Sequence, residues 1–569
     1  MDPRTGLAEV LRTLQNILSS PDLAVSQYLV RSDGDGTTAR FPVLPRDIPP
    51  LLPGKLDETV PSSPSTNQQG QAAAAAAADG DEDEDTLARL AKHLTTDILP
   101  YLNLSSLSPH YYGFVTGGAT PAALLGDLLA SIYDQNVQVH LPRETIATTL
   151  EVATLNLLVQ LFRLPEAAWG VGKRSSGGGG TFTTGATASN VLGLALGREF
   201  VLRKALQRRG VSNSGELSCG EHGVPELMDQ AQIRKIQVLS TLPHSSIAKA
   251  ASIVGIGRKN VVSFSSSQGD GLKIDLARLR EEAARPDVVN ILAISAGEVN
   301  TGRFATDSLD QMNRLRQICD EAGIWIHVDG AFGLFGRVFP PDGDDHDTEF
   351  DAIVRGVDGL ELADSITGDC HKLLNVPYDC GVFFTRHKSL CEDVFQNGNA
   401  AYLTSATTSA STNTAGVDAY DAIQSPLNIG IENSRRFRAL PVYATLRAYG
   451  REGYLDMLKR QIRLARSVSS WLLRDERFEL LPARSGLGQE SEQEALAKTF
   501  IVVLFRVKDE ELMRDFVRRA NDTGKIYMTG TVWDGKPAAR IAISNWRIDM
   551  ERDAKLIEEV LDEVAGGRR

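Results

Sequence analysis

Short runs of β-branched and aromatic residues, bounded by turn residues, alternate along the middle of the chain with stretches whose apolar residues recur at helical spacing. We predict strands over 236–240, 261–264, 288–294, 324–328 and 381–385. The helical spacing is clearest over 189–206, 245–253 and 307–322. This alternation predicts an α/β fold with a mostly parallel sheet, in which ligands bind at the carboxyl ends of the strands.

The two flanks of this region have different patterns. After about residue 430 come a long helical stretch and then mixed strand-like and helical segments, over 435–475, 499–505, 509–520, 539–544 and 551–564. They predict a smaller α+β domain. In the N-terminal flank, 7–18 has helical spacing, whereas 61–85 joins a run of alanines to an acidic run and predicts a linker or surface insertion. We therefore divide the chain into an N-terminal segment, a large α/β domain and a small C-terminal domain, at 1–130, 131–440 and 441–569.

Composition narrows the class of protein. The 569 residues exceed what one hydrophobic core accommodates, which agrees with more than one domain. Lys and Arg number 60 against 73 Asp and Glu, a net charge of −13, so neither nucleic acid nor an anionic membrane is expected as a partner. No apolar run approaches the roughly 18 residues of a membrane span, and the first residues lack the pattern of a secretory signal.

Cysteine usage bears on the compartment. The five cysteines form no CxxC pair, so the sequence predicts neither a disulfide framework nor a zinc ribbon. We expect a reducing, cytoplasmic environment and no metal site.

Glycines gather at 177–180, directly before the sequence TFTTGATASN (181–190), where a helix begins. Glycine permits a close backbone approach, and the first turn of a helix offers unpaired N–H groups, so the segment suits a phosphate. A flexible Gly-rich loop is the alternative. No GKS or GKT follows, which excludes a Walker A loop, and we expect no strand to run directly into this helix, which argues against a dinucleotide fingerprint.

Three chemically capable side chains follow in order. His244 comes after a predicted strand and just before a helix, where it can stack on a planar ligand or only cap the helix. Asp329 ends an apolar strand, and a carboxylate buried there needs a positive partner, either a protonated ring nitrogen or an arginine. Lys372 lies between polar and apolar residues, so it is either a surface lysine or a half-buried amine able to attack a carbonyl. Together with the glycine segment, these residues supply what pyridoxal phosphate requires of a protein.

The sequence resembles the group II pyridoxal-phosphate-dependent amino-acid decarboxylases, which include aromatic-L-amino-acid, tyrosine, glutamate and diaminobutyrate decarboxylases. Five ordered stretches carry the resemblance: HYYGFVTGGATPAALLGD (110–127), TTGATASN (183–190), PHSSIAKAA (243–251), HVDGAFG (327–333) and ADSITGDCHKLLNVPYDCG (363–381). The resemblance implies the aspartate aminotransferase-like fold (fold type I), with a large mostly parallel-sheet domain and a smaller C-terminal α+β domain. It also implies pyridoxal 5′-phosphate as the cofactor.

The resemblance implies a role for each of the three side chains. Lys372 corresponds to the lysine that forms a Schiff base with the cofactor. Asp329 corresponds to the partner that keeps the pyridine nitrogen protonated, and His244 to the imidazole that stacks on the ring and takes part in catalysis.

Further cofactor contacts are implied on both sides of the ring. Thr187 and Ala188 fall where the family binds phosphate, with His371 on the other side. The family often has a Thr-rich stretch where this chain reads GEVNTG (297–302), so Asn300 or Thr301 is assigned to the ring oxygen.

The resemblance also assigns residues to the substrate. Phe114 and Thr116 belong to the first motif and are predicted to contact it. Tyr402 falls where the family has a loop tyrosine that helps to protonate the substrate carbon after CO₂ leaves, and a Ser/Thr-rich stretch follows it.

The implied activity is decarboxylation of an L-amino acid to its amine and CO₂, with an aromatic substrate favoured. Glutamate, cysteine-sulfinate and diaminobutyrate stay open as substrates. A decarboxylation-dependent aldehyde synthase is an alternative, but in that branch phenylalanine replaces the loop tyrosine. An aminotransferase and a non-catalytic homologue are weaker alternatives. The resemblance further implies a homodimer with the active site at the two-fold interface and residues 1–59 wrapping the partner.

Overall fold

The computed structural model describes residues 43–45, 48, 86–265, 271–343, 346–396, 423–482 and 491–566. Several predictions made from the sequence lie outside these residues. They are the helix at 7–18, most of the wrapping segment 1–59, the linker at 61–85, and Tyr402 with the Ser/Thr-rich stretch after it.

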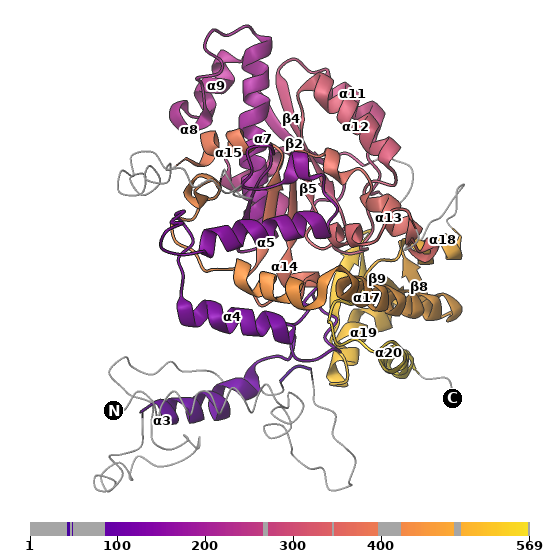
Figure 1. Cartoon of the computed structure of the whole chain (residues 1–569). Coiled ribbons are helices and arrows are strands. Elements are labelled where there is room, and N and C mark those ends of the chain that lie inside the picture. The colour runs from indigo at the N-terminus through magenta and orange to yellow at the C-terminus, as the bar shows by residue number, and fades with distance from the viewer. Residues whose placement is uncertain are drawn as a thin grey trace, which may run out of the picture.

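A seven-stranded sheet lies at the centre of the larger part of the molecule, with helices around it (Figure 1). Its spatial order is β1 (Gly179–Thr183), β7 (Gly381–Thr385), β6 (Ser365–Asp369), β5 (Trp325–Asp329), β4 (Val288–Ser295), β2 (Lys235–Ser240) and β3 (Val261–Ser263). The five strands from β6 to β3 run parallel, and β7 is antiparallel to both of its neighbours. The predicted α/β fold with a mostly parallel sheet is therefore confirmed, and all five predicted strands are present.

Two strands of this sheet were not predicted. β1 begins within the glycine run and leads directly into the helix that follows, so the expectation that no strand precedes this helix was wrong. Its glycines allow close packing, because a Cβ on Gly180 would lie 3.0 Å from the ring of Phe384, its register partner on β7. β6 reads as polar in the sequence, and it becomes a strand because β5 and β7 pair with it on either side.

Helices cover both the sheet and its edges, and their ends follow local sequence signals. In α12 the side chain of Ser308 accepts the N–H of Gln311 at the start, and Gly323 ends the helix with φ 63°. The helices before residue 400 are α3 (Thr86–His93), α4 (Pro121–Tyr133), α5 (Ala147–Leu161), α6 (Glu166–Trp169), α7 (Ala186–Arg208), α8 (Cys219–His222), α9 (Val224–Gln230), α10 (Ser245–Ile253), α11 (Leu276–Ala283), α12 (Leu309–Ala322), α13 (Asp351–Val357), α14 (Cys370–Leu373) and α15 (Lys388–Phe395).

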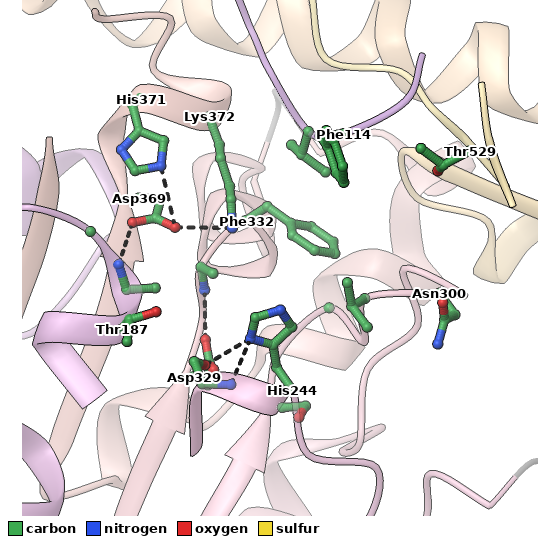
Figure 2. Close-up of a pocket in the computed structure, with 18 of the residues that line it drawn as sticks. Phe114, Thr187, His244, Asn300, Asp329, Phe332, Asp369, His371, Lys372 and Thr529 are labelled. Atoms are coloured by element: carbon green, nitrogen blue, oxygen red, sulfur yellow. Dashed lines mark hydrogen bonds and ion pairs between the residues drawn. The ribbon is translucent and has the colours of Figure 1, made fainter. Parts of the chain in front are cut away.

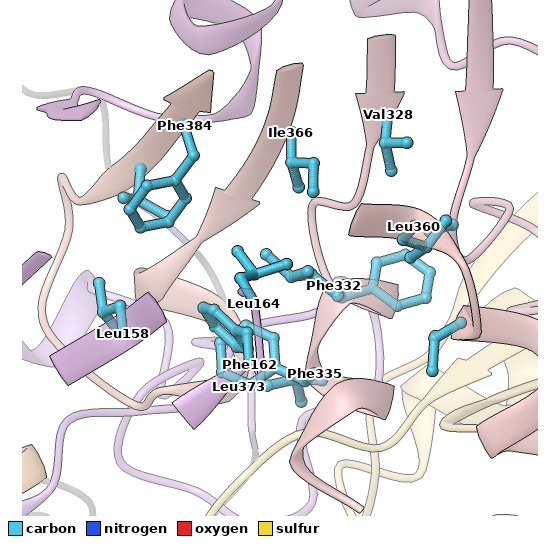
Figure 3. Close-up of a cluster of buried hydrophobic side chains, with 14 of the residues drawn as sticks. Leu158, Phe162, Leu164, Val328, Phe332, Phe335, Leu360, Ile366, Leu373 and Phe384 are labelled. Atoms are coloured by element: carbon cyan, nitrogen blue, oxygen red, sulfur yellow. The ribbon is translucent and has the colours of Figure 1, made fainter. Parts of the chain in front are cut away.

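The main core lies between the sheet and α5 (Figure 3). Leu158 of α5 and Phe162, directly after that helix, are fully buried, as are Val328, Ile366 and Phe384 of the neighbouring strands. Burying such side chains stabilises the fold by about 1.5–3 kcal/mol each. The core thereby fixes the strand ends from which the chemically capable side chains project.

A second, antiparallel sheet follows, with the order β10 (Thr529–Trp533), β11 (Lys536–Ala542), β9 (Val502–Val507) and β8 (Phe478–Leu481). It packs with α19 (Glu510–Asp522) and α20 (Met550–Val564), whereas α18 (Glu492–Lys498) contacts α13 and α17 (Ala439–Arg474). The helix α17 contacts α4 and α5 as well as α20, β8 and β9, and so joins the two sheets (Figure 1). The stretch predicted as one helix is interrupted at Gly450, where φ is 58° and ψ is −169°. Among the described residues, no helix has both the length and the apolar character that a membrane crossing requires.

Candidate active site

A cavity of about 650 Å³ opens where the parallel strands end, and residues from both sheets line it (Figure 2). Asp329 closes β5, Asp369 closes β6, and His244 follows β2. Parallel strands bring their carboxyl ends to one edge of the sheet, so residues far apart in the sequence meet there. The cavity is the place where the separately predicted side chains come together.

Lys372 lies in the single turn of α14, directly after β6. Its Nζ is 2.9 Å from Oδ2 of Asp369, whose side chain is only 4% exposed, and 5.8 Å from the ring centre of Phe332. Oδ1 of Asp369 accepts the backbone N–H of Ala186 at 2.6 Å. Asp369 therefore holds the lysine against the start of α7, a contact that the sequence analysis missed although Asp369 is three residues from Lys372.

The first turn of α7 forms one end of the cavity. Thr187 and Ala188 line it, and the helix start offers backbone N–H groups and the positive end of the helix dipole. His371 faces the same end; its Nδ1 accepts the N–H of Cys380 at 3.3 Å, and burial lowers its pKa. His371 is therefore neutral near pH 7, with its proton on Nε2, 3.6 Å from Asp369.

Asp329 and His244 lie below the end of Lys372 in Figure 2. Asp329 is 8% exposed, and its carboxylate accepts hydrogen bonds from Nδ2 of Asn190 at 3.0 Å and from the N–H of Ala331 at 3.3 Å. In the described part of the chain no lysine, arginine or histidine forms an ion pair with it. A buried carboxylate that faces the cavity and forms no ion pair suits a ligand that brings the positive charge.

The far wall of the cavity comes from loops and from the second sheet. The residues that form it are Phe114, Asn300, Thr529, Thr531 and Arg540. Asn300, a candidate for the ring oxygen, lies in it and accepts a hydrogen bond from the hydroxyl of Thr531 at 2.9 Å. Phe114 is 60% exposed and also lies there.

Two predicted residues do not reach the cavity surface. The hydroxyl of Thr301 donates to Glu298 at 2.8 Å, because the turn over 298–302 points it away from the cavity. Thr116 is buried behind the wall, with its Oγ1 3.3 Å from the hydroxyl of Tyr378, and Tyr378 itself lines the cavity. Thr116 therefore contacts residues that line the cavity, Tyr378 and the backbone of Phe114, but does not line it itself.

Arg540 in β11 is the most consequential residue that the sequence analysis missed. It is 5% exposed and donates to the backbone oxygens of Gly113 and Val299 at 2.7 Å each. Burial lowers the pKa of its guanidinium to about 10, so the group stays charged near pH 7. An arginine inside the apolar strand sequence AARIAIS is a signal that such a charge has a specific use.

His327 lies directly behind the cavity and gives the fold a pH dependence. Burial lowers its pKa from 6.5 to about 4, so the unfolded chain takes up a proton at a pH where the folded protein does not. The stability that depends on the neutral ring is present above pH 6.5 and is lost as pH falls toward 4. Between about pH 7.5 and about pH 5 we expect His327 to lower the free energy of unfolding by about 2 kcal/mol. Urea unfolding of the native protein and of His327→Gln measures this difference, and an identical pH dependence in both proteins would contradict it.

The donor set of the cavity fits pyridoxal phosphate. A helix N-terminus suits the phosphate, a cation-free carboxylate suits the ring nitrogen, and an amine stands ready for the aldehyde.

Comparison with known proteins gives concordant matches. Residues 70–489 match the family model described as the pyridoxal-dependent decarboxylase conserved domain. The aromatic-L-amino-acid decarboxylase of Catharanthus roseus is 24% identical over 538 residues, which cover 92% of this chain and 90% of that protein. The crystal structure of Oryza sativa TDC with PLP and tryptamine superposes with a TM-score of 0.71 at 21% identity, covering 99% of this chain and 97% of the other. That of Rhodiola rosea 4-hydroxyphenylacetaldehyde synthase gives 0.69 at 20% identity, with coverage of 99% and 98%. Both structures share the fold.

Proposed function

Because the chain belongs to the pyridoxal-dependent decarboxylase family, as its motifs predicted, we propose that it decarboxylates an aromatic L-amino acid in the cavity around Lys372. Its class is that of a carboxy-lyase and its cofactor is pyridoxal phosphate. One observation carries the assignment to this cavity. A single space of about 650 Å³ holds the amine of Lys372, the carboxylate of Asp329, the ring of His244 and the first turn of α7.

The cofactor is held at three points. The first turn of α7, with Thr187 and Ala188, binds the phosphate, and Nε2–H of His371 donates to it. Asp329 supplies the negative charge that keeps the ring nitrogen protonated, and Asn190 and the N–H of Ala331 hold that carboxylate in place. His244, exposed to the cavity, offers a flat surface to the ring. Asn300 is the remaining candidate for the ring oxygen.

When bound, the cofactor supplies an electron sink that accepts the electron pair released as CO₂ leaves the substrate. The protein does the rest. Lys372 would supply the amine that attaches the cofactor, and Asp369, 2.9 Å away, would hold the end of that side chain in the cavity. The closed floor of buried strand ends keeps water away from the reacting carbon.

The aromatic assignment is supported by the cavity lining. Phe114, Phe332 and Tyr378 all line the cavity, so an aromatic side chain would find flat apolar partners there. The relative from Catharanthus roseus acts, by its name, on aromatic L-amino acids.

A second substrate class has its own supporting observation. Arg540 brings a buried positive charge to the far wall, next to Asn300 and Thr531. Such a lining favours a substrate whose side chain carries a carboxylate, such as glutamate or cysteine-sulfinate.

A panel of amino acids assayed for CO₂ release separates the two classes. We expect phenylalanine, tyrosine or tryptophan to give the highest kcat/KM. Highest turnover of an acidic amino acid would replace the aromatic assignment by the second class. No release from any amino acid by cofactor-loaded protein would overturn the proposed function.

Tyr402, outside the described residues, is proposed to return a proton to the substrate carbon after CO₂ leaves. The native protein should yield amine and CO₂ in equal amounts, without matching aldehyde and peroxide. Tyr402→Phe removes the phenolic proton, so we expect amine formation to fall by about 10²–10⁴-fold and aldehyde with peroxide to appear. Product analysis by chromatography, with a peroxide assay, tests this. Unchanged amine formation by the variant would assign the proton to another group.

Assembly and location are proposed on independent grounds. Helix α4 exposes the apolar side chains of Leu125, Leu129, Ile132 and Tyr133, the last two at 74% and 70%, which suits burial against a second copy in a homodimer. The five cysteines are all free thiols, which suits the reducing cytoplasm.

A further inference from the structure

Four buried polar side chains form a continuous hydrogen-bonded chain behind the cavity. Trp325 and His327 belong to β5, Ser365 to β6 and Asn190 to α7, and each is fully buried. Oγ of Ser365 lies between the first two side chains, 3.1 Å from Nε1 of Trp325 and 2.8 Å from Nδ1 of His327. On its other side the ring of His327 continues the chain, with Nε2 2.9 Å from Oδ1 of Asn190. Of these four, only Asn190 has been given a role above, as a donor to Asp329.

The direction of every hydrogen bond in this chain is determined. The indole N–H of Trp325 donates to Oγ of Ser365. The carboxylate of Asp329 only accepts, so Asn190 turns Nδ2 toward it and Oδ1 toward Nε2 of His327, which donates. In the neutral ring, Nδ1 then accepts the hydroxyl of Ser365. The lowered pKa of His327 keeps it in this neutral form near pH 7.

The direction of these bonds matters for Asn190. Its side-chain amide has two orientations related by a half-turn, and only one presents hydrogens to Asp329. The N–H of His327 selects that orientation, because it requires Oδ1 on its own side. The two hydrogens on Nδ2 then go to Oδ2 of Asp329 and to Oγ of Ser246, at 3.0 Å each.

The second hydrogen extends the chain to His244. Nδ1 of His244 is an acceptor, since it accepts the backbone N–H of Ser246 at 3.2 Å, so the hydroxyl of Ser246 also donates to it at 2.7 Å. One amide group thus contacts Asp329 directly and His244 through a single hydroxyl.

Close packing leaves this arrangement little freedom. Gly193 lies one helical turn after Asn190 on α7, and a Cβ there would lie 2.4 Å from the ring of His327. The ring therefore fits against the helix only because residue 193 has no side chain.

We propose that Asn190, oriented by His327 and Ser365, is a positioning residue that fixes the carboxylate of Asp329 and the ring of His244 relative to each other. The proposal rests on the proposed function, since it concerns the two residues that hold the cofactor ring. Its consequence is specific: loss of the amide, or its reversal, weakens the hold of Asp329 on the ring nitrogen while the cavity lining stays the same.

The test uses full-length protein loaded with pyridoxal phosphate labelled with ¹⁵N in the ring. The nitrogen NMR signal reports whether the ring nitrogen is protonated. We expect it to be protonated in the native protein and to lose its proton, wholly or in part, in Asn190→Ala and His327→Leu. His327→Gln, which keeps an N–H donor for Asn190, should restore the native signal. The matched control is Asn290→Ala, which removes another buried asparagine of the same sheet. Its side chain is hydrogen-bonded to Gln237 and to the backbone of Glu282 and does not line the cavity.

Kinetics give a second readout. In Asn190→Ala we expect kcat to fall by about 10–100-fold with KM little changed, as is common when a residue behind a site is removed. A native nitrogen signal in folded Asn190→Ala, or an equal change in Asn290→Ala, would overturn the proposal. If His327→Leu does not fold, Asn190→Leu, which is similar in size to asparagine and has no donor, takes its place with the same expected outcome. The signal needs bound cofactor but no substrate, so a failure here is distinct from a failure to decarboxylate.

Discussion

Replacing Lys372 by alanine is expected to reduce decarboxylation by at least about a thousandfold and to abolish the visible absorption band of the bound cofactor. The reason is chemical rather than structural. The amine of Lys372 is proposed to be the cofactor's covalent attachment point, and the helix N-terminus, His371 and Asp329 hold the cofactor only by non-covalent contacts. Absorption spectra and CO₂ release from the same preparation measure both effects.

The fold should survive this change. Asp369 loses its cation in the Lys372→Ala protein, but it keeps the N–H of Ala186 at 2.6 Å, so α7 remains anchored to the end of β6. Lys555→Ala is a suitable control, because that side chain is 79% exposed on α20. A Lys372→Ala protein that retained the absorption band and the activity would contradict the proposed attachment point.

Asp329→Asn should have the second largest effect, a loss in kcat of roughly 30-fold to several thousand-fold. This range corresponds to the about 2–5 kcal/mol lost when one partner of a buried charge pair is removed. Asparagine has nearly the same shape and can still accept a hydrogen bond from Asn190, so the loss isolates the charge. Without that charge the ring nitrogen loses its proton and the ring withdraws electrons less strongly. Steady-state kinetics with a substrate found in the amino-acid panel measure the change.

A cofactor analogue sharpens the Asp329 test. If a carbon atom replaces the ring nitrogen, the native protein and Asp329→Asn should have similar rates, because Asp329 then has no proton to hold. Asp310→Asn, at a side chain 69% exposed on α12, controls for the loss of one negative charge. A difference between the two proteins that stayed the same with the analogue would show that Asp329 acts on something other than the ring nitrogen.

Part of the site could be predicted from the sequence, because some of its residues come directly after predicted strands. His244 and Asp329 are adjacent to apolar runs that any pattern analysis finds, and parallel strands bring their carboxyl ends together. Lys372 is different, because the polar residues of β6 hide that strand. The local sequence left a surface lysine open as the alternative, and the family motif decided between the two. β1 was missed for a related reason: its glycines read as a loop, and pairing with β7 makes them a strand.

The rest of the site depends on packing between distant segments. Arg540 reaches the cavity only because the second sheet packs beside the first, and no local pattern encodes that placement. Thr301 was a candidate by its position, but its hydroxyl turns inward to Glu298. Asn190 belongs to one of the family motifs, but its hydrogen bond to Asp329 forms only because α7 packs against β5, which no local pattern indicates.

The division of the cavity between two sheets bears on how such an enzyme can diverge. The proposed chemical groups sit on the large sheet, whereas Thr529, Thr531 and Arg540 come from a hairpin of the small one, more than 150 residues later. Mutations in that hairpin can therefore reshape the space for the substrate side chain without disturbing Lys372 or Asp329. If the proposed function is right, a duplicated copy of this chain could change its substrate by a few substitutions in this hairpin while it keeps the groups that hold the cofactor.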